Sequence, residues 1–404
     1  MNNQISILLA SLSIFAMMSA PLSATSTIQF ALAEKPDSQE TPVYLIKSHN
    51  PVLKDFLEDR HSFDSGFTAR LNEHQIAGLK KAGIDVEAIP LYQITKPPGS
   101  CSPWPDCNNG DGGTGTTRQF FPQDKIPYGV RMVKGGSDGD GVIDGVRVIV
   151  TVLDTGVFKD HLDLDVGLCK DSTKRGIQNG CDDTNGHGTH VSGTIAANGG
   201  DDGFGIKGVA PEANLWMIKV CGSAGCWSDD IAAAIKYATD QGTNIISMSL
   251  GGDSKSSLIT NAVDYAVQKG VLVVAAAGND GPYDGSIDYP GAYVKVVAVG
   301  AIDKDKNIPS WSSRGINDGD YIVEEREVEF GAPGVLVEST WNNGGYNIIS
   351  GTSMATPHIA GLAAKLWQGN AADTRTYLQD LAKQNDLFPP GDDRATGFGL
   401  PVAP

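Results

Sequence analysis

From about residue 118 onward, short runs of apolar residues alternate with segments in which apolar residues recur at helical spacing. The uninterrupted runs are typical of strands buried on both faces, and they lie at Val146–Leu153, Leu215–Val220, Ile245–Leu250, Val271–Ala277 and Val294–Val299. The segments with helical spacing are Thr189–Ala197, Ser228–Gln241, Ser257–Lys269 and Ser353–Leu366. This alternation predicts an α/β domain over residues 118–404, built on a doubly wound, mostly parallel sheet. In such sheets, reactive groups collect at the carboxyl ends of the strands.

A smaller unit precedes this domain, at residues 42–95. Its pattern predicts three extended segments, at residues 43–46, 63–71 and 84–95. It also predicts two helices, at residues 51–60 and 73–82. The order suits the β-α-β-β-α-β arrangement of a small ferredoxin-like α+β domain. Residues 96–117 are rich in Gly, Pro, Asn and Asp, and this composition predicts an exposed linker that proteases can cut.

The chain starts with an apolar stretch, Ile5 to Met18, that is followed by small residues. Its length is short for a membrane-spanning helix and is typical of a secretory signal peptide. The small residues predict cleavage after residue 24, with a second acceptable position at residue 33. We therefore expect a secreted, extracellular protein without a membrane anchor.

Charge and cysteine content narrow the possible functions. The formal net charge is −17 and basic residues do not cluster, which argues against nucleic-acid binding by phosphate neutralisation. The six cysteines suit an oxidising compartment and form three near pairs, Cys101 with Cys107, Cys169 with Cys181, and Cys221 with Cys226. Local pairing is the simplest connectivity. Metal binding is the alternative, but there is no Cys-x-x-Cys spacing, so we favour disulfides.

Three residues of the α/β domain have the chemistry of a nucleophilic site. Ser353 opens a helix after a glycine turn, where the first N–H groups of a helix have no intrahelical acceptor. Asp154 ends the first long strand, and His187 enters a helix between two glycines. A serine nucleophile needs an imidazole as general base and a carboxylate that fixes the imidazole tautomer. Because Ser353 alone suits a helix cap and Asp154 alone suits a turn, only their combination is informative.

Asn279 supplies a fourth polar group. It follows the apolar strand that ends at Ala277, and its amide can donate to an oxyanion, although Gly-Asn after a strand is also an ordinary turn. His187 and His190 can also be read as a metal-binding pair. Metalloprotease pairs lie four residues apart with a glutamate between them, so we do not expect zinc here.

The segments around these residues resemble those of subtilisin-like serine proteases, the subtilases. They are Val152-Leu153-Asp154-Thr155-Gly156, His187-Gly188-Thr189-His190-Val191-Ser192-Gly193-Thr194, Ser249-Leu250-Gly251-Gly252, Ala276-Ala277-Gly278-Asn279 and Gly351-Thr352-Ser353-Met354-Ala355-Thr356-Pro357-His358. An α/β-hydrolase would instead show Gly-x-Ser-x-Gly and the order Ser, acid, His. The resemblance implies that Ser353 is the nucleophile, His187 the general base and then acid, and Asp154 its orienting partner. It also implies an oxyanion hole made by Asn279 and the Ser353 amide.

The resemblance further implies an extended protein or peptide substrate, held by main-chain pairing between two strand edges. Their residues are Ser249, Leu250 and Gly251 on one side and Gly222, Ser223 and Gly225 on the other. Two acids, Asp280 and Asp288, match positions that border the primary specificity pocket. They either favour Lys or Arg before the scissile bond or point to solvent.

Structural Ca²⁺ is also implied, because subtilases usually hold it with loop oxygens. The matching positions are Asp124, Asp163 and, in the loop 198–206, Asn198, Asp201, Asp202, Phe204 and Ile206. A second possible cation position includes Glu327 and Glu329. The acidic stretch from Asp318 to Glu325 has the composition of a solvated loop.

The unit at residues 42–95 matches the family's propeptide, an intramolecular inhibitor and folding assistant. Its tail, Tyr92-Gln93-Ile94-Thr95, would lie in the substrate cleft, with autocleavage between Thr95 and Arg118. We therefore expect a monomeric, secreted serine endopeptidase that is made as a self-processing zymogen. The alternatives are a catalytically silent binding protein with the subtilase fold, and an esterase on the same scaffold.

Overall fold

The structure is a computed structural model that describes residues 41–94, 120–134, 148–387 and 391–404. The expected signal peptide, the linker and the pair Cys101 and Cys107 lie outside these residues. Contacts divide the chain into two units, Met1–Pro90 with Lys174–Gly176, and Leu91–Thr173 with Ile177–Pro404.

The first unit has the expected ferredoxin-like order of elements. These are β1 (Val43–Ile46), α3 (Pro51–Phe56), β2 (Ser62–Phe63), β3 (Gly66–Arg70), α4 (Glu73–Lys81) and β4 (Val86–Ala88). The sheet order is β2-β3-β1-β4, and every pairing is antiparallel. Each helix starts at an asparagine cap: Asn50 accepts from two N–H groups, and Asn72 forms a reciprocal capping box with Gln75. A small apolar core, which includes Leu53 and Phe67, lies between helices and sheet.

The extended segment expected at 84–95 consists of two strands in two different sheets. β4 pairs with β1, whereas β5 (Leu91–Ile94) belongs to the second unit. Pro90 stands between them, and a proline lacks the N–H that a continuing ladder would need. The boundary between the two units therefore lies at Pro90 and not at residue 95.

The second unit is built on an eight-stranded sheet in the order β16-β15-β14-β12-β6-β9-β7-β8. Its strands are β6 (Ile149–Asp154), β7 (Val166–Asp171), β8 (Gln178–Asn179), β9 (Asn214–Lys219), β12 (Ile245–Met248), β14 (Leu272–Ala276), β15 (Val297–Ile302) and β16 (Phe330–Pro333). All neighbours pair in parallel except β7 and β8. The predicted doubly wound, mostly parallel α/β fold is thus confirmed.

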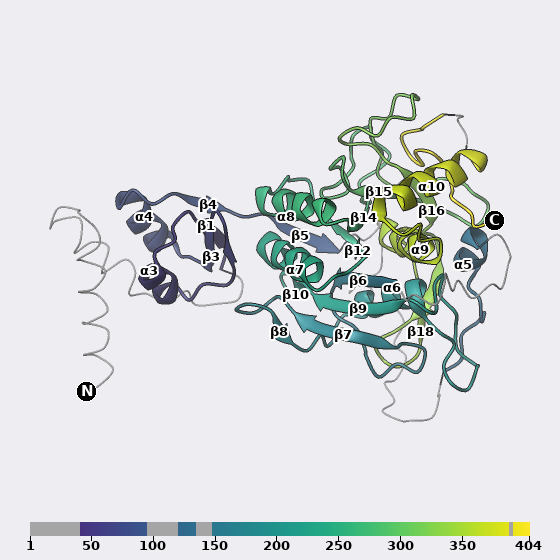
Figure 1. Cartoon of the computed structure of the whole chain (residues 1–404), viewed down its shortest axis with the longest axis horizontal. Coiled ribbons are helices and arrows are strands. Elements are labelled where there is room, and N and C mark those ends of the chain that lie inside the picture. The colour runs from purple at the N-terminus through teal and green to yellow at the C-terminus, as the bar shows by residue number, and fades with distance from the viewer. Residues whose placement is uncertain (1–40, 95–119, 135–147, 388–390) are drawn as a thin grey trace. The chain divides into compact units, whose positions relative to one another are not determined.

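Helices cover both sides of this sheet. α6 (His187–Ala196) packs against α9 (Thr352–Lys365) on one side, and α7 (Ser228–Asp240) packs against α8 (Ser257–Gln268) on the other (Figure 1). Two further helices, α5 (Tyr128–Val133) and α10 (Ala371–Gln384), contact α9. α9 is buried along its whole length, which suits its Ala- and Gly-rich sequence and places its first turn inside the protein.

Two smaller sheets complete the unit. β17 (Val337–Thr340) and β18 (Tyr346–Ile349) form a hairpin. The other sheet has the order β10-β11-β5-β13, in which β10 (Cys221–Gly222), β11 (Gly225–Trp227) and β13 (Leu250–Gly251) join β5. Two of the expected disulfides are present, Cys169–Cys181 and Cys221–Cys226, and the second joins β10 to β11.

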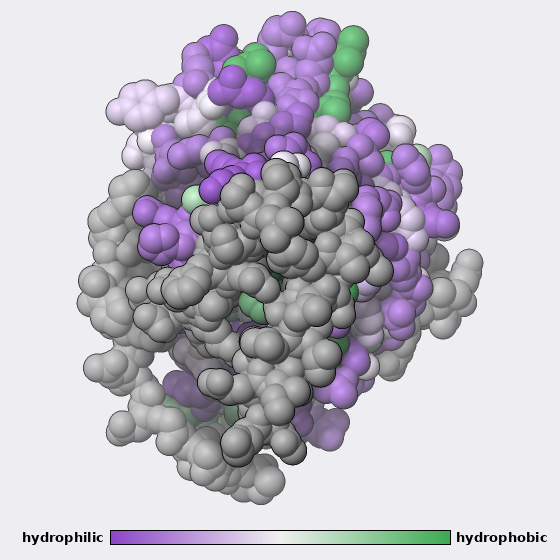
Figure 2. Space-filling view, turned by 90° about the vertical axis from the view of Figure 1, so that its left-hand side faces the viewer, coloured by the Kyte–Doolittle hydropathy of each residue, from purple (hydrophilic) through white to green (hydrophobic). Residues whose placement is uncertain are grey.

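The surface fits the acidic composition. On the face shown in Figure 2, the coloured residues are mostly hydrophilic, and the hydrophobic ones occur singly or in small groups. Across the described residues, each helix is too short or too polar to cross a bilayer.

Candidate active site

The site forms where neighbouring parallel strands end at one edge of the sheet. β6 ends at Asp154, β12 is followed by Ser249, and β14 is followed within three residues by Asn279. These three strands are adjacent in the sheet order, so their carboxyl ends lie together. The first turn of α9 brings Ser353 to the same edge, where Thr352 and Ser353 bond to residues that follow β14 and β12.

Asp154 and His187 form the first contact of the site. His187 Nδ1 lies 2.8 Å from Asp154 Oδ1, and both side chains are fully buried. The same carboxylate oxygen accepts from the backbone N–H of Thr155 at 2.7 Å. A carboxylate fixed in this way holds the imidazole in the tautomer that carries hydrogen on Nδ1, which leaves Nε2 as the basic nitrogen.

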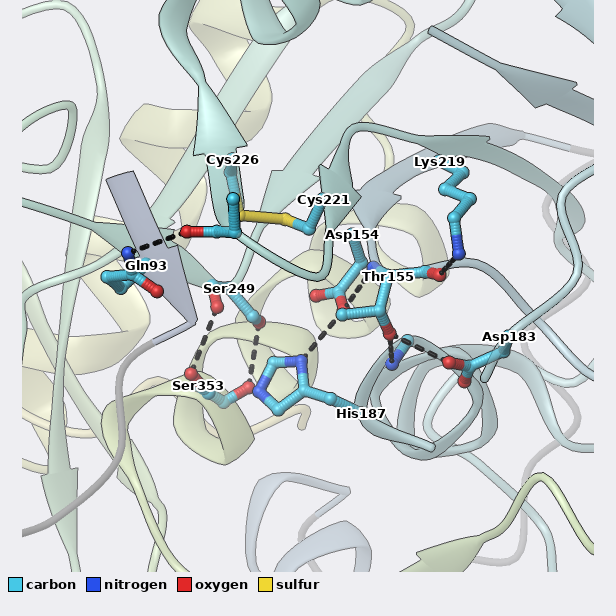
Figure 3. The surroundings of a disulfide bond; sticks show 12 residues. Gln93, Asp154, Thr155, Asp183, His187, Lys219, Cys221, Cys226, Ser249 and Ser353 are labelled. Atoms are coloured by element: carbon cyan, nitrogen blue, oxygen red, sulfur yellow. Dashed lines mark hydrogen bonds and ion pairs between the residues drawn. A yellow bond between two sulfur atoms is a disulfide. The ribbon is translucent and has the colours of Figure 1, made fainter. Parts of the chain in front are cut away.

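Ser353 is the second residue of α9, and its hydroxyl is buried at the site. Its Oγ donates to the carbonyl oxygen of Ser249 at 3.0 Å, and Ser249 Oγ donates back to the Ser353 carbonyl at 2.8 Å. In Figure 3 the Ser353 side chain points toward the His187 ring. The reciprocal bonds fix the helix start against the strand end, so the Ser353 hydroxyl is held by two rigid elements.

Asn279 presents its amide nitrogen. Its Oδ1 accepts from the N–H of Thr352 at 3.0 Å and from the Thr352 hydroxyl at 3.2 Å. Because the oxygen is held in this way, Nδ2 is the end left to donate, and it is buried with no acceptor among the described residues. A buried, fixed and unused donor beside the nucleophile suits stabilisation of an oxyanion.

Asp183 positions the start of α6, and sequence reasoning missed it. Its carboxylate accepts from the N–H groups of Asn185, Gly186 and Thr189 at 2.9–3.0 Å. It also accepts from the hydroxyls of Thr189 at 2.6 Å and of Thr155 at 2.9 Å. The bond with Thr155 is drawn in Figure 3. The available signal was an aspartate two residues before Asn-Gly, a pattern typical of a turn that bonds its own backbone.

His190 does not take part in the site. Its Nε2 lies 3.0 Å from the carbonyl oxygen of Val337, and burial lowers its pKa to about 3. It is a neutral, buried histidine, and the structure gives no support to a metal-binding pair with His187.

β5 occupies the space between the two expected strand edges. It pairs antiparallel with β13, where Leu250 faces Ile94 and Gly251 faces Gln93. It also pairs antiparallel with β11, where Cys226 faces Tyr92. The described chain thus supplies its own extended segment to both edges.

One of those edges differs from the expectation. Gly222 lies on β10, one strand away from β5, and Ser223 lies in the turn between β10 and β11. The residues that face β5 on this side start at Gly225 and continue to Trp227. The β10–β11 hairpin is closed by the disulfide Cys221–Cys226, and it is β11 that lies next to β5. The sequence did not reveal where this hairpin turns, so the residues of the turn were assigned to the edge.

Asp288 is buried beside β13, at the other edge. Its side chain packs so closely against Gly251 and Gly278 that a Cβ on either glycine would come within 2.7 Å of it. Burial, together with the charges of Asp280 and Asp253, raises the pKa of Asp288 to about 8. Desolvation and the charge of Asp253 also raise the pKa of Asp280, although this residue lies at the surface. The alternative that both acids simply point to solvent is therefore wrong for Asp288.

The first expected calcium position is partly assembled. Asp163 Oδ2 accepts from the N–H of Ile206 at 2.9 Å and from the Tyr346 hydroxyl at 2.8 Å. Asn198 N–H donates to the Asp163 carbonyl at 2.9 Å. The loop backbone approaches the carboxylate so closely that a Cβ on Gly205 would lie 1.8 Å from Oδ1, so only glycine fits this cradle of oxygens. The Asp163 carboxylate and the backbone carbonyl oxygens that the loop 198–206 carries are of the hard type that Ca²⁺ binds.

Other residues expected at this position have different partners. Asp124 forms an ion pair with Arg131, which lowers the pKa of the carboxyl. Asp201 is exposed, and Asp202 accepts from the N–H of Phe204. Phe204 is 53% exposed and its ring contacts Phe121 edge-on. The structure therefore brings Asp163, Asn198 and Ile206 together but leaves these four side chains outside the cradle.

The second expected cation position needs correction. Glu329 is fully buried, and its carboxylate accepts from the Arg375 guanidinium at 2.7–3.1 Å and from Gln379 at 2.7 Å. This ion pair occupies both oxygens, so Glu329 has no oxygen left for a cation. Glu327, two residues earlier, has a different partner and accepts from the N–H of Glu324 at 2.8 Å.

Comparison with known proteins agrees with this geometry. A model of the subtilase family matches residues 145–399. A subtilisin of Bacillus sp. (strain TA39) is 44% identical over 362 residues, which are 83% of each chain. Subtilisin Savinase of Lederbergia lenta is 38% identical over 278 residues, which are 68% of this chain and 96% of that one.

Solved structures give the same result. S41 Psychrophilic Protease is 46% identical, with a TM-score of 0.66 over 70% of this chain and 100% of that chain. Sphericase is 44% identical, with a TM-score of 0.64 over the same shares. The chain therefore belongs to the subtilase family and is a serine endopeptidase.

Proposed function

We propose that Asp154, His187 and Ser353 are the catalytic triad of this endopeptidase. The observation that carries the proposal is the 2.8 Å contact of Asp154 with His187 Nδ1, at the strand edge where α9 presents Ser353. His187 Nε2 takes the proton of Ser353 Oγ as the oxygen attacks the scissile carbonyl, and it then gives that proton to the leaving amine. Water repeats the sequence on the acyl-enzyme and frees the serine.

Ser353 Oγ turns from the Ser249 carbonyl to His187 Nε2 before it attacks. Apo sites often hold such bonds in a relaxed arrangement that tightens when substrate binds. The oxyanion of the tetrahedral intermediate accepts from Asn279 Nδ2 and from the Ser353 N–H at the start of α9. Both donors are fixed before the reaction, so they stabilise developing charge without reorganising.

A labelling experiment tests this assignment and separates the alternatives. A fluorophosphonate probe should modify the processed enzyme at Ser353, and Ser353→Ala protein should stay unlabelled. A silent binding protein would give no label and no turnover. An esterase would take the label and cleave a p-nitrophenyl ester but leave casein intact, whereas we expect cleavage of both.

We further propose that residues 42–90 and β5 are the propeptide of a secreted zymogen. The pairing of β5 with β11 and β13 supports this, because an extended product would use the same main-chain bonds. Tyr92 anchors the segment: it is 1% exposed, and its hydroxyl donates to the Ser254 carbonyl at 2.5 Å. Cleavage falls between Thr95 and Arg118, after export directed by residues 1–24 or 1–33.

Expression of the inactive variant tests self-processing. Ser353→Ala protein should accumulate at full length after signal removal, and mass spectrometry of wild-type product should place the new N-terminus between residues 96 and 118. Adding a trace of active enzyme to the variant should restore cleavage. Normal processing of pure Ser353→Ala protein would show that a different protease does the cutting.

Structural calcium is the last part of the proposal, at the Asp163 cradle. Asp163, the Asn198 side chain and backbone carbonyls of the loop 198–206 would hold the ion, and its role would be to fix this loop. Asp163→Asn should lower the calcium stoichiometry of the protein. Unchanged calcium content in that variant would remove the cradle from the proposal.

A further inference from the structure

Three carboxylates from two distant segments meet on the second unit. Asp318 and Asp320 lie in the loop between β15 and β16, and Asp392 follows α10. One oxygen of each lies within 4.8 Å of the other two. Asp318 and Asp320 are exposed, whereas Asp392 is 2% exposed. Three like charges at this spacing repel one another unless a cation lies among them.

The burial of Asp392 is a second, independent indication that a cation binds here. Its Oδ1 accepts from the Tyr321 N–H at 3.0 Å. Its Oδ2 is buried and has no hydrogen-bond partner within the part of the chain that the structure describes. Burying a carboxylate oxygen without a donor is costly, and buried charges are normally paired or bound to metals. The geometry of Asp392 therefore calls for a positive group at its second oxygen.

The basic side chains nearby are engaged elsewhere. Lys255 pairs with Glu325 at 2.6 Å, and Arg394 pairs with Asp284. Lys383 lies over the ring of Tyr321, 5.1 Å from its centroid. These contacts leave the carboxylates of the cluster to another partner.

The loop itself is shaped around the cluster. Asp318 Oδ1 accepts from the Asp320 N–H at 3.3 Å, and Asp320 Oδ1 accepts from the Ile322 N–H at 2.7 Å. One oxygen of each carboxylate is thus used to turn the loop, and the other remains for a ligand. Glu327 is a fourth acid close by: burial raises its pKa, and the charges of Asp392, Glu324 and Asp318 add to the effect.

We propose that Asp318, Asp320 and Asp392 bind a divalent cation, and that this cation is Ca²⁺. Three hard carboxylate oxygens, two of them on an exposed loop, with a further acid beside them, suit the six to eight oxygen ligands and loose geometry of Ca²⁺ better than the strict octahedron of Mg²⁺. The ion joins the loop before β16 to the segment after α10. It replaces the cation position that the sequence placed at Glu327 and Glu329, and it is separate from the Asp163 cradle.

Calcium counting on an inactive full-length chain tests the site. Ser353→Ala protein, stripped with chelator and then desalted, is titrated with CaCl₂ by calorimetry. The same background is titrated with Asp392→Asn, with Asp318→Asn/Asp320→Asn, and with Asp380→Asn as the control, because Asp380 is an exposed acid of α10 outside the cluster. We expect one bound ion fewer, or at least about a tenfold weaker one, in the first two variants only.

Limited proteolysis gives a second readout. Arg326 is exposed at the end of the loop, so trypsin cleavage after Arg326, followed by mass spectrometry, reports loop opening. Calcium should slow this cut at least about tenfold in the parent and in Asp380→Asn, but not in Asp392→Asn. The double variant at the two exposed aspartates keeps the test meaningful if Asp392→Asn fails to fold.

Equal stoichiometry and equal protection in all four proteins would overturn the proposal. Loss of an ion only in Asp163→Asn would do the same, since it would assign all calcium to the other site. Neither result would affect the labelling of Ser353, so this experiment tests the cation site independently of the proposed catalytic triad.

Discussion

Burial of Asp288 predicts a specificity that changes with pH. Its pKa is raised to about 8, so the carboxyl is neutral below that pH and becomes a carboxylate above it. A lysine side chain before the scissile bond keeps its charge to about pH 10. Its attraction to Asp288 should therefore appear only as pH rises through 8, whereas an ordinary surface aspartate is already ionised well below this pH.

The size of the effect follows from the ionised fraction. A group with a pKa of about 8 is about 3% ionised at pH 6.5 and about 90% ionised at pH 9. If only the ionised form favours lysine, the preference for lysine over its neutral isostere norleucine rises by up to about 30-fold between these pH values. The profile of kcat/KM reports the free enzyme, so its midpoint should match the pKa of unoccupied Asp288.

The assay measures kcat/KM for two peptide anilides that differ only in lysine or norleucine before the cleaved bond. Titration of the catalytic groups affects both substrates alike, so it cancels in their ratio. Asp288→Asn keeps the side-chain shape and should make the ratio flat. Asp280→Asn should shift the midpoint to lower pH, because the charge of Asp280 helps to raise the pKa of Asp288. A flat ratio in the wild type, or the same rise in Asp288→Asn, would refute the reasoning.

Four other changes probe the rest of the structure. Asn279→Ala should lower kcat by about 10²–10³ with little change in KM, measured by steady-state kinetics, and a loss under tenfold would remove Asn279 from the oxyanion hole. Asp183→Asn replaces a carboxylate that accepts five hydrogen bonds by an amide that can accept at only one atom. Urea unfolding of the inactive chain should therefore show a free energy of unfolding lower by about 1–3 kcal/mol, and an unchanged midpoint would contradict the positioning role of Asp183. Glu329→Gln leaves the mostly buried Arg375 without its carboxylate partner, so the free energy of unfolding should fall by about 3 kcal/mol in the same assay. A change near zero would mean that water reaches the guanidinium. Chelator should lower Tm, since calcium at 100 times its Kd stabilises by about 2.7 kcal/mol, and Asp163→Asn should show a smaller response than the parent.

Much of the catalytic region could be predicted because its signals are local. Asp154 and Asn279 stand at or just after the ends of uninterrupted apolar strands, and both strands are present within a few residues of their expected bounds. Ser353 lies in the first turn of a helix that is capped by Gly351, close to the expected helix start. The resemblance to subtilases then gave the pairing of Asp154 with His187, which is long-range and has no local signal.

The errors arose where the partner was distant or the pattern was mixed. Glu329 looked like a cation ligand because its guanidinium partner lies 46 residues further along the chain. β7 was missed because glycine and charged residues interrupt its apolar run. The start of α10 had a signal that was overlooked, since Asn370 caps the helix by accepting from the N–H of Asp373.

In the zymogen proposed above, the position of β5 would also set the kinetics of activation. A segment joined to the chain that it blocks competes with substrate at a fixed effective concentration, on the order of millimolar for short flexible connections. Diluting the enzyme cannot weaken that block. A cut after β5 leaves the segment tied to the protein only by its own contacts, so its occupancy then depends on the total concentration of released peptide. One broken bond would thus turn a concentration-independent restraint into one that fades as the secreted protein disperses.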